Sequence, residues 1–187
     1  MNLNIVLLAS FLFFLSEIYL TLSRRSQKGS SKTRKDRRSL LLFWLVIPLG
    51  FFLGFSLAYH GYWQLPQLLI ALFGLAVYVA GLCIRWIAIL QLKREFTVDV
   101  AIAKGHQLKT DGIFQYLRHP SYLGLWLSCT GLAIAMNNPF SILVIAFPLF
   151  LAIHYRIRIE EAVLIKEFGI AYEEYKSKSS RMIPGIY

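Results

Sequence analysis

The stretch Leu117-Arg118-His119-Pro120-Ser121-Tyr122-Leu123-Gly124 decides the fold of this chain, because it joins a polar segment to a long apolar one. Proline at 120 disfavours the helical conformation for His119, so a helix is predicted to begin near Ser121. An arginine, a histidine and a tyrosine surround this proline at the mouth of the apolar run. Such a concentration of polar side chains indicates a functional site at a membrane surface.

Composition excludes a water-soluble domain. The 187 residues are 57% hydrophobic and 16% charged, and the mean hydropathy is +0.55. A chain of this size cannot bury so much apolar surface in a water-facing globule. The first apolar run has no basic segment or small-residue cleavage site, so we expect no cleavable signal peptide. Residues 1–187 are expected to form a single all-α integral membrane domain.

Five apolar segments are predicted to cross the membrane as helices: 3–22, 40–59, 67–90, 122–136 and 140–155. The turn signal Asn137-Asn138-Pro139 makes the last two a helical hairpin. No helix breaker lies between Arg156 and Phe168, so the final helix is predicted to continue through this stretch and to end at Gly169. At roughly 28 residues and about 42 Å, it exceeds the ~30 Å hydrocarbon core and should project from it.

The positive charges follow the membrane topology. Every Lys and Arg except Arg85 falls in 23–39, 91–121 or 156–187, which alternate with segments that carry none. The positive-inside rule therefore places these three segments, and the site, on the cytoplasmic face. The membrane would be the plasma membrane of a prokaryote or the endoplasmic reticulum of a eukaryote. The basic loop 24–38 is expected to contact anionic lipid, and nucleic acid is not expected as a partner.

Two charged residues lie within apolar segments. Glu17 is about one turn from the end of the first segment, and we expect its carboxylate to reach the headgroups. Arg85, near the inner end of the third segment, is expected to snorkel or to face a polar cavity. Between them and the 118–122 motif, the alternation of residues 96–103 predicts an extended segment, followed by turns at Lys104-Gly105 and Asp111-Gly112.

A second polar patch, residues 156–161, lies at the inner end of the final helix. Arg156 and Glu160 are four residues apart and share one helical face. They are either a surface ion pair or an arginine that orients an anionic group beside a carboxylate. The hairpin brings them within one helix pair of the 118–122 motif, about 8–10 Å between axes, which favours the second interpretation.

The histidines give no metal site, because His106 and His119 have no further ligands at suitable spacing. The sequence also has no phosphate-binding glycine loop and no serine nucleophile elbow. Catalysis by positioning a reactive cofactor against a substrate fits these residues better than covalent or metal catalysis.

These motifs together resemble a known family, the isoprenylcysteine carboxyl methyltransferases, in a wider group with the phospholipid N-methyltransferases. The matching residues are Gly105-His106-Gln107-Leu108, Gly112-Ile113-Phe114, the stretch 118–124, Arg156, Glu160-Glu161, Leu164, Phe168-Gly169, Tyr172, Tyr175, Arg181 and Pro184. The resemblance covers about residues 85–187, a methyltransferase-like core, whereas the N-terminal spans in 1–84 match only in hydropathy.

The resemblance implies a membrane methyltransferase that binds S-adenosylmethionine without a Rossmann domain. It implies cofactor contacts from His106, Gln107, Leu108, Lys109, Phe114, Arg118, His119, Pro120, Ser121, Tyr122 and Glu161. It implies that Arg156 and Glu160 are the catalytic residues on the substrate side. Two positions depart from the family pattern, since Phe114 replaces a usual tyrosine and Lys109 a usual apolar residue.

Three functions remain open from the sequence. The first is methylation of a carboxylate on an isoprenylcysteine-type lipid that enters from the bilayer. A carboxylate is anionic at neutral pH, so the enzyme needs to align and desolvate it rather than to deprotonate it. The second is N-methylation of a phospholipid or another small amphiphile, and the third is non-catalytic lipid binding.

Overall fold

The computed structural model describes residues 3–23, 34–61, 63, 65, 68–93 and 108–185, without the side chains of residues 34–37. The elements in chain order are α1 (Leu3–Ser23), α2 (Arg34–Tyr59), α3 (Leu68–Leu92), the 3-10 helix η1 (Gly112–Gln115), α4 (Pro120–Ala135), α5 (Pro139–Phe168) and α6 (Ile170–Lys178). These ranges contain no β-strand, only an isolated bridge between Leu117 and Ser180.

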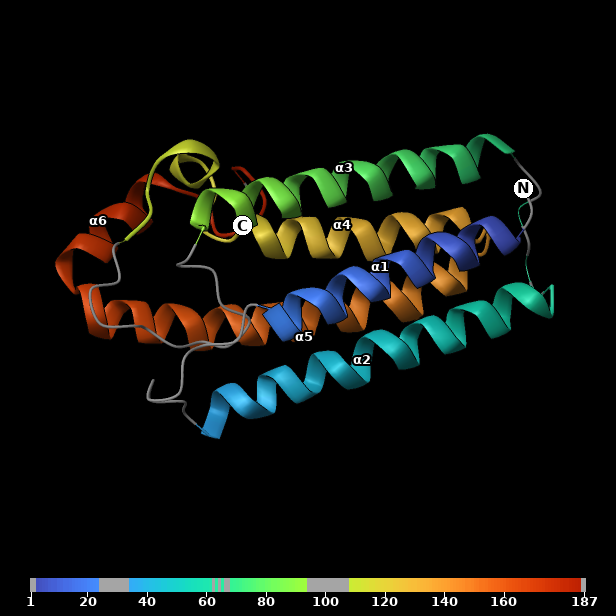
Figure 1. Cartoon of the computed structure of the whole chain (residues 1–187), viewed down its shortest axis with the longest axis horizontal. Helices are drawn as coiled ribbons and strands as arrows, with labels where there is room; N and C mark the ends of the chain where they lie inside the picture. Colours follow the sequence, from blue (N-terminus) through green and yellow to red (C-terminus); the bar gives the residue numbers. More distant parts are fainter. Residues whose placement is uncertain are drawn as a thin grey trace.

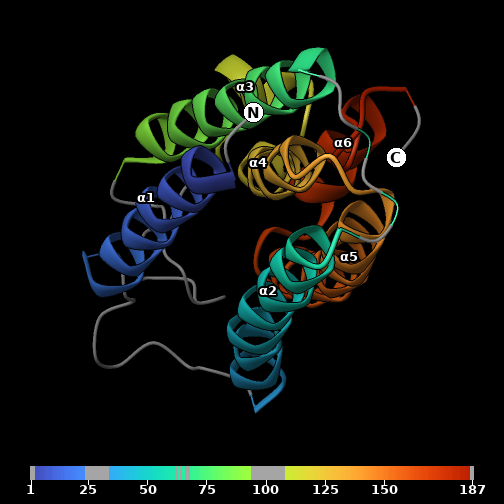
Figure 2. The ribbon, with the colours of Figure 1, turned by 90° about the vertical axis from the view of Figure 1, so that its right-hand side faces the viewer.

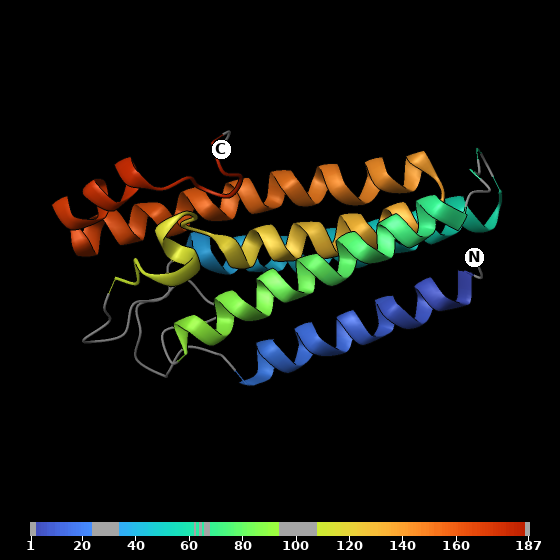
Figure 3. The ribbon, with the colours of Figure 1, turned by 90° about the horizontal axis from the view of Figure 1, so that it is seen from above.

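The five long helices form an up-and-down bundle (Figure 1). Viewed along the bundle, α4 lies at its centre, with α1 and α3 on one side and α2 and α5 on the other (Figure 2). The tail after α6 turns back toward the bundle (Figure 3). The start of α2, the ends of α1 and α3, η1 and α6 therefore gather at one end of the molecule.

All five predicted helices form. Four described helices are long and apolar enough to cross a bilayer: α1, α2 from Arg38, α3 and α5. The fifth, α4, has 16 residues and a length of about 24 Å, as its short apolar run predicted. It is enclosed by the other helices, so a short length does not expose its ends to lipid.

The hairpin between α4 and α5 also forms as predicted. Asn137 takes the left-handed conformation with φ of 56°, and the Asn138 side chain accepts a hydrogen bond from Ser141 N at 3.0 Å. Pro139 occupies the first helical position, where its missing N–H costs nothing. Gly169, with φ of 52°, ends α5 where expected.

Glycines allow α3 and α4 to pack backbone against backbone. A Cβ atom added at Gly81 would lie 2.5 Å from Ser128 N, and one added at Gly74 would lie 2.5 Å from Ala135 N. Small residues at an interface let membrane helices approach closely. Close packing matters there because, in lipid, no hydrophobic effect drives two helices together. The contact gives the site a rigid support.

Three predictions about elements need correction or lie outside the structure. Helix α2 begins at Arg34, inside the segment expected to be a loop, because Arg and Lys are good helix formers and continue an adjoining helix. Helix α6 was not predicted, since its polar sequence has no apolar period; the buried Tyr172 holds it in place. The extended segment 96–103, the turn at 104–105 and most of the basic loop lie outside the described residues.

The prediction for Glu17 was wrong. Its carboxylate does not extend to a headgroup but pairs with Arg85 at 2.6 Å between Oε2 and Nη2. Arg85 is correspondingly buried and does not snorkel. The reason is tertiary: α1 lies beside α3 and α4, so the two charges meet inside the bundle, where pairing costs less than separate burial.

Candidate active site

The 118–122 motif is held against the C-terminal tail by backbone hydrogen bonds. Arg118 N donates to Ser180 O at 2.9 Å, and His119 N donates to Arg181 O at 3.0 Å. In return, Ser180 N donates to Tyr116 O at 3.0 Å. The motif therefore leads from η1 into α4: Arg118 and His119 precede the helix, and Pro120 occupies its first position.

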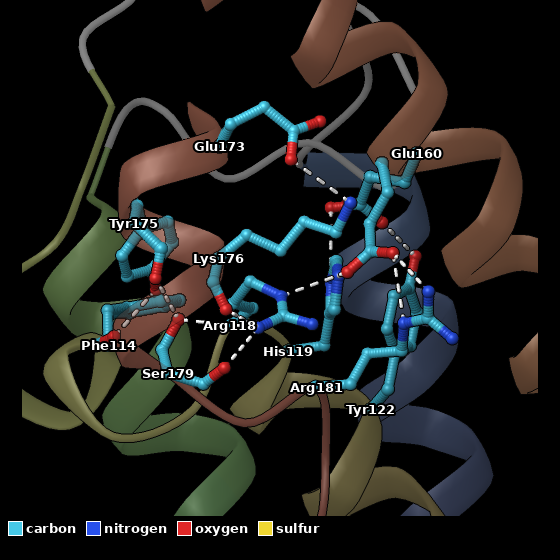
Figure 4. A network of polar contacts seen from close by, with 11 residues as sticks. Phe114, Arg118, His119, Tyr122, Glu160, Glu173, Tyr175, Lys176, Ser179 and Arg181 are labelled. Atoms are coloured by element: carbon cyan, nitrogen blue, oxygen red, sulfur yellow. Dashed lines mark hydrogen bonds and ion pairs between the residues drawn. The ribbon is translucent and has the colours of Figure 1, made fainter. Parts of the chain in front are cut away.

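A buried carboxylate, Glu161, joins the motif to the tail. Its Oε1 accepts a hydrogen bond from Arg118 Nε at 2.9 Å, and its Oε2 accepts one from Arg181 Nε at 2.9 Å. Arg118 Nη1 also donates to the carbonyls of Lys176 and Ser179 (Figure 4). With Glu161 only 4% exposed, this pairing compensates the cost of burying its charge.

The hydroxyl of Tyr122 joins the motif to the second polar patch. It accepts a hydrogen bond from Arg156 Nε at 2.9 Å and donates one to Glu160 Oε2 at 2.8 Å. His119 Nδ1 lies 3.8 Å from Glu160 Oε1. The predicted meeting of the two patches at the inner end of the hairpin is thus confirmed, and Arg156 is a buried residue rather than half of a surface ion pair.

Helix α2 contributes two side chains that sequence reasoning missed. Ser39 Oγ accepts a hydrogen bond from Arg156 Nη1 at 2.7 Å, and the Phe43 ring lies 5.7 Å from Arg156 Cζ. Phe43 also packs edge-on against Tyr122, with ring centroids 6.2 Å apart. A single serine and a phenylalanine at the start of an apolar run carry no signal, so only the packing of α2 on α5 reveals them.

Two buried polar atoms beside these networks have no hydrogen-bond partner in the described part of the chain: His119 Nε2 and Tyr172 Oη. His119 Nε2 lies 3.5 Å from Glu161 Oε1, which is too long for a good hydrogen bond. Burial, with Glu161 and Glu160 nearby, raises the pKa of Tyr172, so its hydroxyl stays protonated at neutral pH. A buried polar atom without a partner is costly, so these two atoms are candidates for contacts with a polar ligand.

The remaining predicted residues occupy different surroundings. Lys109 Nζ pairs with Asp111 Oδ1 at 2.8 Å near the surface, and Leu108 is half-buried. Phe114 is buried, and its carbonyl accepts a hydrogen bond from Tyr175 Oη at 2.6 Å. Burial raises the pKa of that tyrosine to about 12. His106 and Gln107 lie outside the described residues.

A family model, the isoprenylcysteine carboxyl methyltransferase family, matches residues 73–166 of this sequence. This range is half of the chain and contains the 118–122 motif with Arg156, Glu160 and Glu161. The chain belongs to this family. Membership of a methyltransferase family implies a methyl donor. The described residues contain no β-strand and therefore no Rossmann fold.

The chain is also similar in sequence to individual proteins of this family. A protein-S-isoprenylcysteine O-methyltransferase of Schizosaccharomyces pombe is 38% identical over 57% of this chain, and the match covers 46% of that protein. One of Saccharomyces cerevisiae is 29% identical over 99% of this chain and 80% of its own length. The chain thus spans about half the length of the fission-yeast protein and of its Dictyostelium discoideum counterpart, where the match covers 47%.

A solved structure has the same fold. The structure described as a eukaryotic intramembrane Ras methyltransferase superimposes with a TM-score of 0.59 and 26% sequence identity. The match covers 84% of this chain and 55% of that one. This coverage extends beyond the 73–166 range, so more of this chain follows the membrane architecture of the family than the family model alone matches.

Proposed function

We propose that this protein transfers a methyl group from S-adenosylmethionine to the carboxylate of an isoprenylcysteine-type lipid at the cytoplasmic face of its membrane. The observation that carries the proposal is the chain of hydrogen bonds from Arg156 through the Tyr122 hydroxyl to Glu160. Two buried polar atoms, His119 Nε2 and Tyr172 Oη, lie beside it with no hydrogen-bond partner among the described residues. Membership of the methyltransferase family supports it.

The residues on the side of the 118–122 motif fit the cofactor. S-adenosylmethionine supplies an electrophilic methyl group on a sulfonium when bound. Within the described part of the chain, the Tyr172 hydroxyl has no hydrogen-bond partner, and His119 Nε2 has only the Glu161 carboxylate at 3.5 Å, so both atoms are candidates for contacts with the cofactor. The residues proposed to hold the cofactor with them are His106, Gln107, Leu108, Lys109, Phe114, Pro120, Ser121 and Tyr122. Arg118 and Glu161 belong to the same predicted set, and we propose that they support the cofactor contacts, because their charges bind each other and Arg118 also binds the tail.

On the substrate side, the proposed task of Arg156 is to attract and orient the acceptor carboxylate. Tyr122 and Ser39 fix its Nε and Nη1, so the guanidinium is held in one orientation before any substrate arrives. Glu160 accepts a hydrogen bond from the Tyr122 hydroxyl and thereby sets the direction in which the O–H bond points. Such preorganisation lowers the cost of aligning the reactants.

The membrane setting follows from the topology. The proposed site lies at the end of the bundle that holds the start of α2, the ends of α1 and α3, η1 and α6. The distribution of Lys and Arg along the sequence assigns this end to the cytoplasm by the positive-inside rule. A lipid tail would enter sideways from the bilayer while its carboxylate stays at this end. The basic segment 24–38 is proposed to bind anionic lipid there.

The test is transfer of a radiolabelled methyl group from S-adenosylmethionine to a farnesylated cysteine analogue by the purified protein. We expect a methyl ester, which base hydrolyses to release volatile label. Calorimetry with S-adenosylhomocysteine serves as the control for cofactor binding. Binding without transfer would overturn the carboxyl acceptor, and no binding at all would favour a non-catalytic lipid-binding protein.

N-methylation of an amino headgroup is the second candidate. The Glu160 side chain is 30% exposed, so its carboxylate is accessible to an ammonium group. An amine acceptor such as phosphatidylethanolamine would give a base-stable methylated product, which distinguishes the two reactions in the same assay.

A further inference from the structure

An ion pair joins α1 to α3 inside the bundle. Arg85 Nε donates to Glu17 Oε1 at 2.7 Å, and Arg85 Nη2 donates to Glu17 Oε2 at 2.6 Å. The side chains are 8% and 18% exposed. This two-point contact between the planar guanidinium and the carboxylate fixes their angle as well as their distance.

The third nitrogen of the same guanidinium reaches α4. Arg85 Nη1 donates to the Ser121 carbonyl at 3.0 Å and to the Ser121 hydroxyl at 3.1 Å. This reach depends on the close packing of the helices, since a Cβ atom at Gly124 would lie 2.5 Å from Arg85 N. One side chain therefore connects three helices, α1, α3 and α4.

The contact on α4 is one residue away from the proposed active site. Ser121 directly precedes Tyr122, whose hydroxyl bridges Arg156 and Glu160. The amides of Tyr122 and Leu123 both donate to the His119 carbonyl, at 3.1 and 3.2 Å. Because this is a single helical turn, a shift of Ser121 moves the Tyr122 hydroxyl with it.

The pair also selects one position for α1. The other α1 side chains that are buried are Val6, Ser10, Phe13 and Leu20. In a bilayer such contacts compete with equally apolar lipid and do not by themselves choose one arrangement. A charge left unpaired within the membrane is costly, so the pair favours the arrangement that joins Glu17 to Arg85. The hydrogen bond from Tyr78 Oη to Ala9 O is a second polar contact between α1 and α3.

We propose that the Glu17–Arg85 pair is a positioning device for the active site. The pair holds α1 and the first turn of α4 in one arrangement, and it acts on the reaction through Ser121 and Tyr122 rather than by contact with substrate. The expected effect on kcat rests on the proposed function. The effect on the position of α4 does not, because amide hydrogen exchange measures it without any reaction.

The test is the double variant Glu17→Leu/Arg85→Met. Replacing both charges with apolar side chains leaves no unpaired charge, so the bundle is expected to stay folded. We expect faster amide hydrogen exchange at Tyr122 and Leu123, unchanged exchange in residues 128–135, and a kcat for methyl transfer at least about tenfold lower. S-adenosylhomocysteine affinity and the melting temperature complete the comparison.

The matched control is Tyr78→Phe, which removes the hydrogen bond from Tyr78 Oη to Ala9 O at 3.2 Å. It loosens α1 from α3 without touching Ser121, so exchange at Tyr122 and kcat should match the wild type. A folded double variant with wild-type amide exchange at Tyr122 and Leu123 would overturn the inference. So would a Tyr78→Phe variant that shows the same faster exchange and the same lower kcat as the double variant.

Two further outcomes are separable. If the double variant does not fold, Arg85→Lys takes its place, because it keeps the positive charge but cannot make the two-point contact with the Glu17 carboxylate. Faster amide exchange at Tyr122 in this variant supports the inference, and unchanged exchange overturns it. If the wild-type protein methylates no acceptor, the proposed function fails, while the exchange at Tyr122 and Leu123 still decides whether the ion pair positions α4.

Discussion

The Tyr122 hydroxyl is the point where the two halves of the proposed site meet. It receives one hydrogen bond from Arg156 and gives one to Glu160, so both of its hydrogen-bonding roles are used. Hydrogen bonds to charged groups are stronger than neutral ones, and each contributes about 1.5–3 kcal/mol. Loss of this single oxygen therefore disturbs the orientation of both charged side chains.

Tyr122→Phe tests this role because it removes the oxygen and keeps the ring that packs on Phe43. We expect kcat/KM for the acceptor to fall by about 10- to 100-fold, the equivalent of one charged hydrogen bond. Steady-state methyl transfer by the purified variant measures the loss. Tyr116→Phe, an exposed tyrosine next to the motif, is the control and should match the wild type. Equal activity of Tyr122→Phe and the wild type would contradict the role.

At the scale of the elements, the contact between α3 and α4 decides where the motif stands. Both helices are predominantly apolar on all sides, so periodicity does not show which faces pack together. The glycines do, because only they permit backbone contact. The α3–α4 contact also carries Arg85 to Ser121, and so it links the support of the bundle to the site.

Gly81→Ala should destabilise this contact. The added Cβ would lie 2.5 Å from Ser128 N, and backbone cannot move aside cheaply. Overpacking of this kind costs about 1–3 kcal/mol. Thermal unfolding in detergent measures the loss. Gly50→Ala on α2 is the matched control, since its added Cβ meets its nearest atom at 3.2 Å and should cost less. An unchanged melting temperature of Gly81→Ala would show that α3 and α4 are farther apart than described.

At the scale of the whole molecule, the tail closes the bundle on itself. Residues 176–181 return to the 118–122 motif at the start of α4, and Glu161 on α5 is the carboxylate to which both Arg118 and Arg181 bind. This arrangement joins the motif and the tail in one packed unit beside the proposed cofactor site.

Glu161→Gln should weaken the contact between the tail and the 118–122 motif and destabilise the fold. The change keeps the shape of the side chain but leaves the buried Arg118 without its counter-charge, a loss of about 3–5 kcal/mol for a buried pair. Glu173→Gln, which removes a surface pair with Lys176 at 3.3 Å, should alter stability by less than about 0.5 kcal/mol. Urea unfolding in detergent compares the two variants. Equal stabilities would contradict the role of Glu161.

The sequence by itself determined the membrane class, the five helices, the hairpin turn at Asn137-Asn138-Pro139 and the meeting of the two polar patches. Hydropathy, turn chemistry and the distribution of charge are properties of single segments and their lengths, so they need no knowledge of neighbours. The end of α5 at Gly169 was predicted correctly for the same reason, because a glycine ends a helix through its own backbone conformation.

Only the tertiary structure decided which helices touch. It paired Glu17 with Arg85, set Ser39 and Phe43 from α2 against Arg156, and folded the tail onto the 118–122 motif through α6. These contacts join residues far apart in the chain, and in a bundle that is apolar throughout, no sequence period marks the contacting faces. Close backbone packing and the pairing of buried charges select those faces.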